Sequence, residues 1–179
     1  MKTSAQWWSE TKQDNVKLIA WLKKQYHGEL SASERIYEFV YSRCTDTRHA
    51  ATLKTIAAQE RLHALWVGDL LTARSIEIES KEGATRYWKE VEGVASSFEL
   101  AAAVAALAEN MRLERIRVIA ADQTAPEDIR SVFEKILPQE VWHEQAFREM
   151  TNQDSIDKVT AAHKAGVDSI GLMTVKEVL

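Results

Sequence analysis

Cysteine, proline and glycine are all scarce in this 179-residue chain, which has one cysteine, two prolines and six glycines. Glycine and proline together make up 8 of the 179 residues, well below the roughly 12% of average usage. So few turn-forming residues argue against a many-stranded sandwich or barrel. The single cysteine, Cys44, excludes an internal disulfide framework and any cysteine-rich zinc or iron site.

The chain also lacks a strong excess of one charge and a long hydrophobic run. Its 23 basic and 27 acidic residues leave a net charge of −4, which gives no electrostatic footprint for nucleic acid. The longest apolar run, 100–108, is far shorter than the roughly 20 residues that a transmembrane helix needs. The first eight residues lack the apolar stretch of a signal peptide. We therefore expect a cytoplasmic protein with no nucleic-acid partner and no transmembrane segment.

Helical periodicity is the main pattern that is present. Apolar residues recur at helical spacing in four long segments, over about 14–43, 47–72, 97–121 and 126–150. Short turns join the first pair and the second pair, which indicates antiparallel neighbours. About two dozen residues, 73–96, link the two pairs, and they include a predicted short helix at 84–92. Two hairpins joined by one long crossover predict an all-α, ferritin-like four-helix bundle.

The domain prediction is one ferritin-like domain over 1–179. Its bundle core spans about 14–150, and a C-terminal extension, 151–179, contains a fifth helix at about 155–165. Ser96 with Glu99, and Thr124 with Glu127, have the spacing of capping boxes. Pro138 should kink the fourth segment.

Two Glu-x-x-His motifs lie 80 residues apart, one in the second segment and one in the fourth. They consist of Glu60, His63, Glu140 and His143. The spacing places each carboxylate and imidazole on one helix face. The same offset of 80 residues relates Glu29 to Glu109, so one helical hairpin is used twice.

The turns select Glu29 and Glu109 over the nearby Glu34 and Glu114. Facing residues in an antiparallel hairpin are equidistant from the turn, and the midpoint of positions 29 and 60 falls between residues 44 and 45. The midpoint of 109 and 140 likewise falls in the second turn. Glu34 and Glu114 would lie about 7 Å too close to their turns. We expect these two, with Arg35 and Arg115, to form exposed or interhelical ion pairs.

All six selected side chains continue apolar stripes, so four carboxylates and two imidazoles point into one interior. Buried unpaired carboxylates are very costly unless they are protonated, paired or bound to metal. Two divalent cations would solve this problem, and an oxygen-rich set with two imidazoles suits iron or manganese.

The pattern resembles that of ferritin-like di-iron or di-manganese carboxylate proteins, over residues 17–150. Residues 28–37 resemble the first ligand helix of demethoxyubiquinone hydroxylases and rubrerythrins, and residues 132–147 resemble the last helix of rubrerythrin-type domains. The resemblance implies two iron ions, with manganese or a mixed pair as alternatives. It also implies that Glu60 and Glu140 bridge the metals, that Glu29 and Glu109 are terminal, and that each metal has one histidine.

The sequence departs from this pattern at several positions. Gln59 and Gln139 stand where relatives often have an aspartate that orients the opposite histidine. Tyr37 follows Glu29 by eight residues rather than seven, and the second glutamate that rubrerythrins carry on the third helix has no match near Glu109.

The leading hypothesis is an oxidoreductase that activates dioxygen or peroxide, with no catalytic residue separate from the metal ligands. It would be a hydroxylase or oxygenase component acting on an unknown small molecule, or a peroxide-scavenging rubrerythrin-like protein. Either would need a separate electron donor or reductase, because the chain has no rubredoxin cysteines and no Gly-x-Gly-x-x-Gly fingerprint. The alternative is a non-enzymatic iron-binding protein or a metal-clamped interaction protein. The oligomeric state, a homodimer included, stays open.

Overall fold

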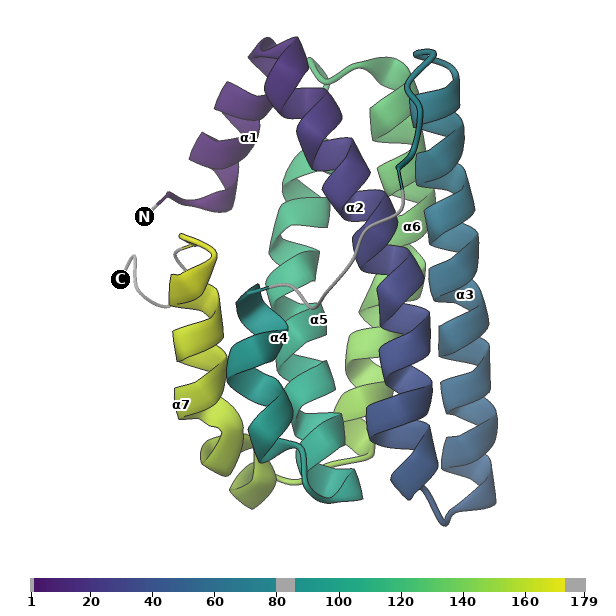
Figure 1. Cartoon of the computed structure of the whole chain (residues 1–179), viewed down its shortest axis with the longest axis vertical. Helices are drawn as coiled ribbons and strands as arrows, with labels where there is room; N and C mark the ends of the chain where they lie inside the picture. The colour runs from purple at the N-terminus through teal and green to yellow at the C-terminus, as the bar shows by residue number, and fades with distance from the viewer. Residues whose placement is uncertain (1, 80–85, 173–179) are drawn as a thin grey trace.

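The computed structural model describes residues 2–79 and 86–172, and these form an all-α fold around four long helices (Figure 1). The four are α2 (Asn15–Arg35), α3 (Thr47–Thr72), α5 (Phe98–Ala121) and α6 (Glu127–Glu149). Helix α2 packs along α3, and α5 packs along α6, while α3 and α6 join the two hairpins. The predicted all-α class and the ferritin-like arrangement are confirmed.

The first predicted segment is helical throughout but changes its winding near its end. Helix α2 runs through Gly28 to Arg35 and continues as a π-helix, Ile36–Val40, and a 3₁₀ turn, Tyr41–Arg43. Helix α3 then begins behind Asp46, whose carboxylate accepts hydrogen bonds from two backbone N–H groups of its first turn. The observed bounds of α3 coincide with the predicted 47–72.

Both capping predictions at the second hairpin are wrong. The side chain of Ser97, not Ser96, caps α5 by accepting a 3.2 Å hydrogen bond from the third helical N–H. Helix α6 has Pro126 at its cap position and no side-chain cap. Thr124 instead donates from its backbone N–H to Asp122, at 2.9 Å, within the turn. The spacing signal cannot separate neighbouring serines or detect a competing turn.

A helix that periodicity did not predict, α1 (Ser4–Gln13), packs against α2 and α5 (Figure 1). Thr3 and Gln6 form a reciprocal capping box at its start. Trp8 on α1 is 2% exposed, and its indole N–H donates a 2.8 Å hydrogen bond to Asp122 in the α5–α6 turn. Helix α1 is therefore attached to the bundle by the buried Trp8 ring and by this hydrogen bond.

The crossover and the C-terminal extension pack on one another. Within the crossover, α4 (Arg86–Val91) is followed by a 3₁₀ turn that passes through Gly93, and positions 84 and 85 of the predicted helix lie outside the described residues. Helix α7 (Gln153–Ser169) is longer than the predicted 155–165, and it packs on α4 and α5. A Cβ at Gly166 would lie 2.6 Å from the Tyr87 ring, so this glycine permits the close approach.

Two apolar clusters fill the interior, and they lie at different levels of the bundle. In α3, residues 53–57 belong to one cluster and residues 67–71 to the other. The Glu-x-x-His motifs fall between these levels in both α3 and α6. Among the described helices, none combines the length and apolar composition that crossing a bilayer requires.

Candidate metal centre

The layer between the two apolar clusters is polar and buried. The exposed fraction is 0% for five of the predicted ligands and 5% for Glu109. The five are Glu29, Glu60, His63, Glu140 and His143. Glu34, the competing position on α2, is exposed, and Glu114 on α5 is half-buried. On α2, Glu29 is therefore buried and Glu34 is exposed, as the distances from the turn predict.

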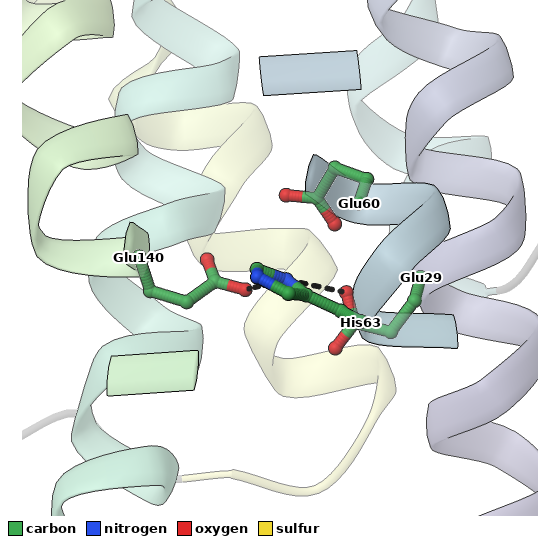
Figure 2. Close-up of side chains that lie close together, drawn as sticks. All are labelled: Glu29, Glu60, His63 and Glu140. Carbon is green, nitrogen blue, oxygen red and sulfur yellow. Dashed lines mark ion pairs between the residues drawn. The ribbon is translucent and has the colours of Figure 1, made fainter. Parts of the chain in front are cut away.

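Four of these side chains come from three helices and meet at one point (Figure 2). Glu29 of α2, Glu60 and His63 of α3, and Glu140 of α6 place one ligand atom each within 4.8 Å of one another. Nδ1 of His63 lies 3.2 Å from the Glu140 carboxylate and 4.0 Å from that of Glu29. This cluster could hold a metal ion.

His143 contacts the carboxylates of the same layer. Its Nδ1 is 3.1 Å from Glu60 and 3.6 Å from Glu140, and its ring stacks on that of His63 with centroids 5.7 Å apart. Glu140 therefore lies near both imidazoles, and Glu60 lies near His143. Glu109 is outside the group of four.

Each histidine is held by a glutamine of the opposite hairpin. Nε2 of His63 lies 3.1 Å from Oε1 of Gln139, and Nε2 of His143 lies 2.8 Å from Oε1 of Gln59. Because an amide oxygen only accepts, the proton sits on Nε2 of each ring. Both Nδ1 atoms then face the carboxylates, which is the orientation that a metal ligand needs.

Several buried polar atoms in this layer lie close to one another but make no hydrogen bond. They are Oε1 of Glu60, Oε2 of Glu140, and Nδ1 of His63 and of His143. Buried polar atoms are rarely left without a partner. Carboxylate oxygens and imidazole nitrogens that converge in this way suit divalent iron or manganese.

One residue at the centre, Arg112, was not predicted from the sequence. It lies on α5, one turn after Glu109, and its guanidinium pairs with four carboxylates. The distances are 3.0 Å to Glu140 and 3.3 Å to both Glu60 and Glu109, and the fourth partner is Glu29. The guanidinium supplies positive charge where cations are expected.

The available signal for Arg112 was its spacing of three residues from Glu109, which places both on one helix face. The repeat gave no help, because the position 80 residues earlier is Ala32. A second missed residue is Gln25, whose amide donates to Glu29 from the same helix. Tyr37 is 39% exposed and packs on Tyr41, so it lies away from this layer.

The carboxyl groups of this layer differ in the direction of their pKa shifts. Burial outweighs the attraction of Arg112 and raises the pKa of Glu29 and Glu109 well above the ordinary value. Burial also opposes ionisation of Glu60, but Arg112 and His143 outweigh it and lower that pKa to about 2. Burial likewise disfavours charged His143, yet its carboxylate partners raise its pKa to about 10. Protonation of Glu29 and Glu109, together with the positive charge of Arg112, reduces the buried negative charge of the carboxylates.

Comparison with known proteins places this centre in a family. No curated protein and no solved structure matches the chain. The family model described as Rubrerythrin matches residues 21–151, a stretch that holds both Glu-x-x-His motifs together with Glu29 and Glu109. The chain belongs to the rubrerythrin family, a ferritin-like di-iron carboxylate family.

Proposed function

We propose that this protein is a di-iron carboxylate oxidoreductase that activates dioxygen or peroxide. The proposed ligands are Glu29, Glu60, His63, Glu109, Glu140 and His143. The observation that carries the proposal is the convergence of four buried carboxylate and imidazole atoms, none of which makes a hydrogen bond, between the hairpins. A di-manganese or mixed pair would use the same ligands.

The positions of the side chains support a division of roles. Glu140 lies 3.2 Å from His63 and Glu60 lies 3.1 Å from His143, so these two glutamates are suited to bridging, and Glu29 and Glu109 would be terminal. Gln59 and Gln139 hold the imidazoles with Nδ1 facing inward. When bound, two iron ions would supply the electrons that reduce dioxygen or peroxide. The two apolar clusters lie on either side of this layer along the bundle.

Arg112 has to give up part of its contacts when metal binds, because it already pairs with all four carboxylates. Its side chain is 21% exposed and also borders a cavity, so it has space to withdraw. We expect the guanidinium to move toward that cavity and to keep contact with Glu109, one turn away on the same helix.

The proposed cycle needs electrons from outside the chain. The sequence has one cysteine and no Gly-x-Gly-x-x-Gly fingerprint for a nicotinamide or flavin. The pure protein should therefore complete a single turnover after chemical reduction and then stop. Sustained oxygen consumption with NADH or NADPH and no added partner would contradict this.

The second candidate is a non-enzymatic, ion-paired or metal-clamped bundle. The contacts of Arg112 favour it, since this residue already neutralises part of the charge without a metal. The two candidates differ in metal content and in reactivity. The enzyme binds two metals that oxidants can turn over, whereas the clamp binds fewer than two, or metals that no oxidant changes.

The test combines elemental analysis with the reaction of reduced, anaerobic protein. We expect two iron ions per chain and an optical and Mössbauer change on addition of dioxygen or peroxide. Glu29→Gln should lower iron content strongly, and Glu34→Gln, five residues along the same helix, should leave it unchanged. Equal losses from both variants would overturn the ligand assignment.

A further comparison separates the two types of oxidoreductase. Peroxide consumption without an organic product would indicate a scavenger, and product that depends on an added organic substrate would indicate a hydroxylase. Metal that neither oxidant changes would leave only the clamp.

A further inference from the structure

A cavity of about 800 Å³ lies beside the metal centre. Its walls come mainly from α1, α2, α4, α5 and the residues 170–172 that follow α7, so segments outside the four-helix bundle help to enclose it. Glu109 and Arg112 form part of its lining, and through them it meets the carboxylate layer. A volume of this size suits a small organic molecule.

One part of the wall is apolar and made of small side chains. The alanine-rich stretch of α5 admits two explanations, a cavity beside Glu109 or close helix packing. Ala101, Val104, Ala105 and Ala108 line the cavity. Other alanines of the same stretch are fully buried in the core, so both explanations hold for different faces of α5. Ile36 and Phe147 extend the apolar wall.

The rest of the lining is strongly basic. Seven basic residues face three acidic ones around the cavity, although the whole chain carries a net charge of −4. The basic residues are Lys2, Lys17, Lys24, Arg35, Arg86, Arg112 and Arg115, and the acidic ones are Glu10, Glu92 and Glu109. This local excess of positive charge favours an anionic ligand.

Like Arg115, Arg35 is a lining arginine whose Nε has no hydrogen-bond partner. Its guanidinium lies 4.2 Å from the centroid of the Trp88 ring, and one Nη donates a 2.9 Å hydrogen bond to Ser31. Its Nε is buried without a hydrogen-bond partner, and within the described part of the chain it forms no ion pair with a carboxylate. The ion pair expected for Arg35 is therefore absent, and Arg115 likewise lies over a ring, that of Trp7, at 5.1 Å.

A half-buried guanidinium without a counter-ion is an unfavourable arrangement. Burial and the nearby charge of Arg112 lower the pKa of Arg35 to about 10, against the attraction of Glu60, Glu109 and Glu34. A bound anion would supply the missing charge, and the Nη end of the guanidinium, rather than the enclosed Nε, could bind a carboxylate through charge-assisted hydrogen bonds.

We propose that the cavity binds an organic carboxylate with an apolar body, its carboxylate on Arg35 and its body against the Val104, Ala105 and Phe147 wall. A carboxylate fits better than a phosphate monoester, because a phosphate carries up to two charges and three acceptor oxygens, and Arg35 offers one fork. That this molecule is the substrate of the metal centre rests on the proposed function, whereas its binding does not.

Tryptophan fluorescence can measure the binding, because Trp7, Trp21 and Trp88 line the cavity. The probe is decanoate below its micelle concentration, compared with decanol and decyl phosphate, on the full chain with and without iron. We expect saturable binding of decanoate in both forms, and binding of decanol that is at least about tenfold weaker.

Variants of two arginines test the carboxylate contact. Arg35→Gln should weaken decanoate binding by about tenfold or more without changing the binding of decanol, and Arg35→Lys should restore part of it. Arg48→Gln is the matched control, because the Arg48 side chain is 87% exposed and outside the cavity lining. Unchanged decanoate binding in Arg35→Gln, or tighter binding of decyl phosphate, would overturn the proposal.

A filled cavity gives an independent test. Ala105→Leu should reduce the binding of decanoate and of decanol alike, with the circular dichroism spectrum retained. Binding that survives Ala105→Leu would place the ligand elsewhere and overturn the proposal. Decanoate binding by a protein that reacts with no oxidant would support the cavity assignment and contradict the proposed function. A protein that turns over an oxidant but does not bind decanoate would support the proposed function and contradict the cavity assignment.

Discussion

The guanidinium of Arg112 lies 3.0 Å from the carboxylate of Glu140, in the buried layer that holds both Glu-x-x-His motifs. Arg112 also pairs with the other three glutamates of that layer. In the metal-free protein, one arginine therefore offsets repulsion among carboxylates that come from four different helices.

Arg112→Gln should destabilise the metal-free protein and increase the stabilisation that metal provides. Removing one partner of a buried ion pair costs about 3 kcal/mol or more, because the remaining charge is left unpaired. Thermal unfolding with and without added iron measures both effects. Arg130→Gln is the control, because Arg130 forms a 2.8 Å pair with the half-exposed Glu134 on one face of α6 and should change stability by less than about 1 kcal/mol. A metal-free Arg112→Gln protein as stable as the parent would contradict this expectation.

Gln59→Leu and Gln139→Leu should each lower iron affinity by about tenfold to a hundredfold. Each glutamine accepts the Nε2 proton of the histidine on the opposite hairpin, at 2.8 Å and 3.1 Å, and so keeps Nδ1 available. Competition with a coloured chelator measures the affinity. Gln153→Leu, at the exposed start of α7, should leave it unchanged, and an equal effect of all three variants would contradict the role of the two glutamines.

Asp122→Asn should loosen the attachment of α1 in a way that depends on pH. Lys12, Thr124 and Trp8 hold the pKa of the Asp122 carboxyl well below its usual value of about 3.9. Because the folded pKa is the lower one, the stabilisation is present above about pH 4 and is lost as the pH falls. The expected loss in the variant is about 1–2 kcal/mol at pH 7.

Urea unfolding at pH 7, 4 and 3 tests this expectation, and the difference between parent and variant should narrow toward pH 3. Asp154→Asn serves as the control, because the Asp154 side chain is 76% exposed and pairs only with Lys158 among the described residues. A difference that stays constant with pH would show that the ionised form of Asp122 is not what matters.

Gly166→Ala should destabilise the protein by about 2 kcal/mol, because the added Cβ would meet the Tyr87 ring at 2.6 Å and the Tyr87 carbonyl oxygen at 3.3 Å. Gly28→Ala is the matched helical substitution, since a Cβ there meets nothing within 4 Å. It should stabilise the protein by up to about 1 kcal/mol. Thermal melts of the two variants should therefore shift in opposite directions, and shifts of the same sign would contradict the close packing of α4 and α7.

The sequence determined the bundle and the faces of its helices. The helical spacing of the apolar residues and the lengths of the turns predicted helices at 47–72 and 97–121. The structure places them at Thr47–Thr72 and Phe98–Ala121. The duplicated Glu-x-x-His motif and the distance from each turn pointed to Glu29 rather than Glu34, and Glu29 is the buried one. These features depend on local spacing along single helices and hairpins, which is written directly in the order of residues.

Only the tertiary structure decided what fills the centre and what lies beside it. Spacing placed Arg112 on the face of Glu109, but a long basic side chain on such a face can extend to solvent or fold inward. The packing of four helices brings four carboxylates within its reach. The cavity beside Arg35 likewise exists because α1, α4 and the residues that follow α7 pack over the bundle. Contacts between elements far apart in the chain leave no periodic signal, so no pattern within one segment could predict them.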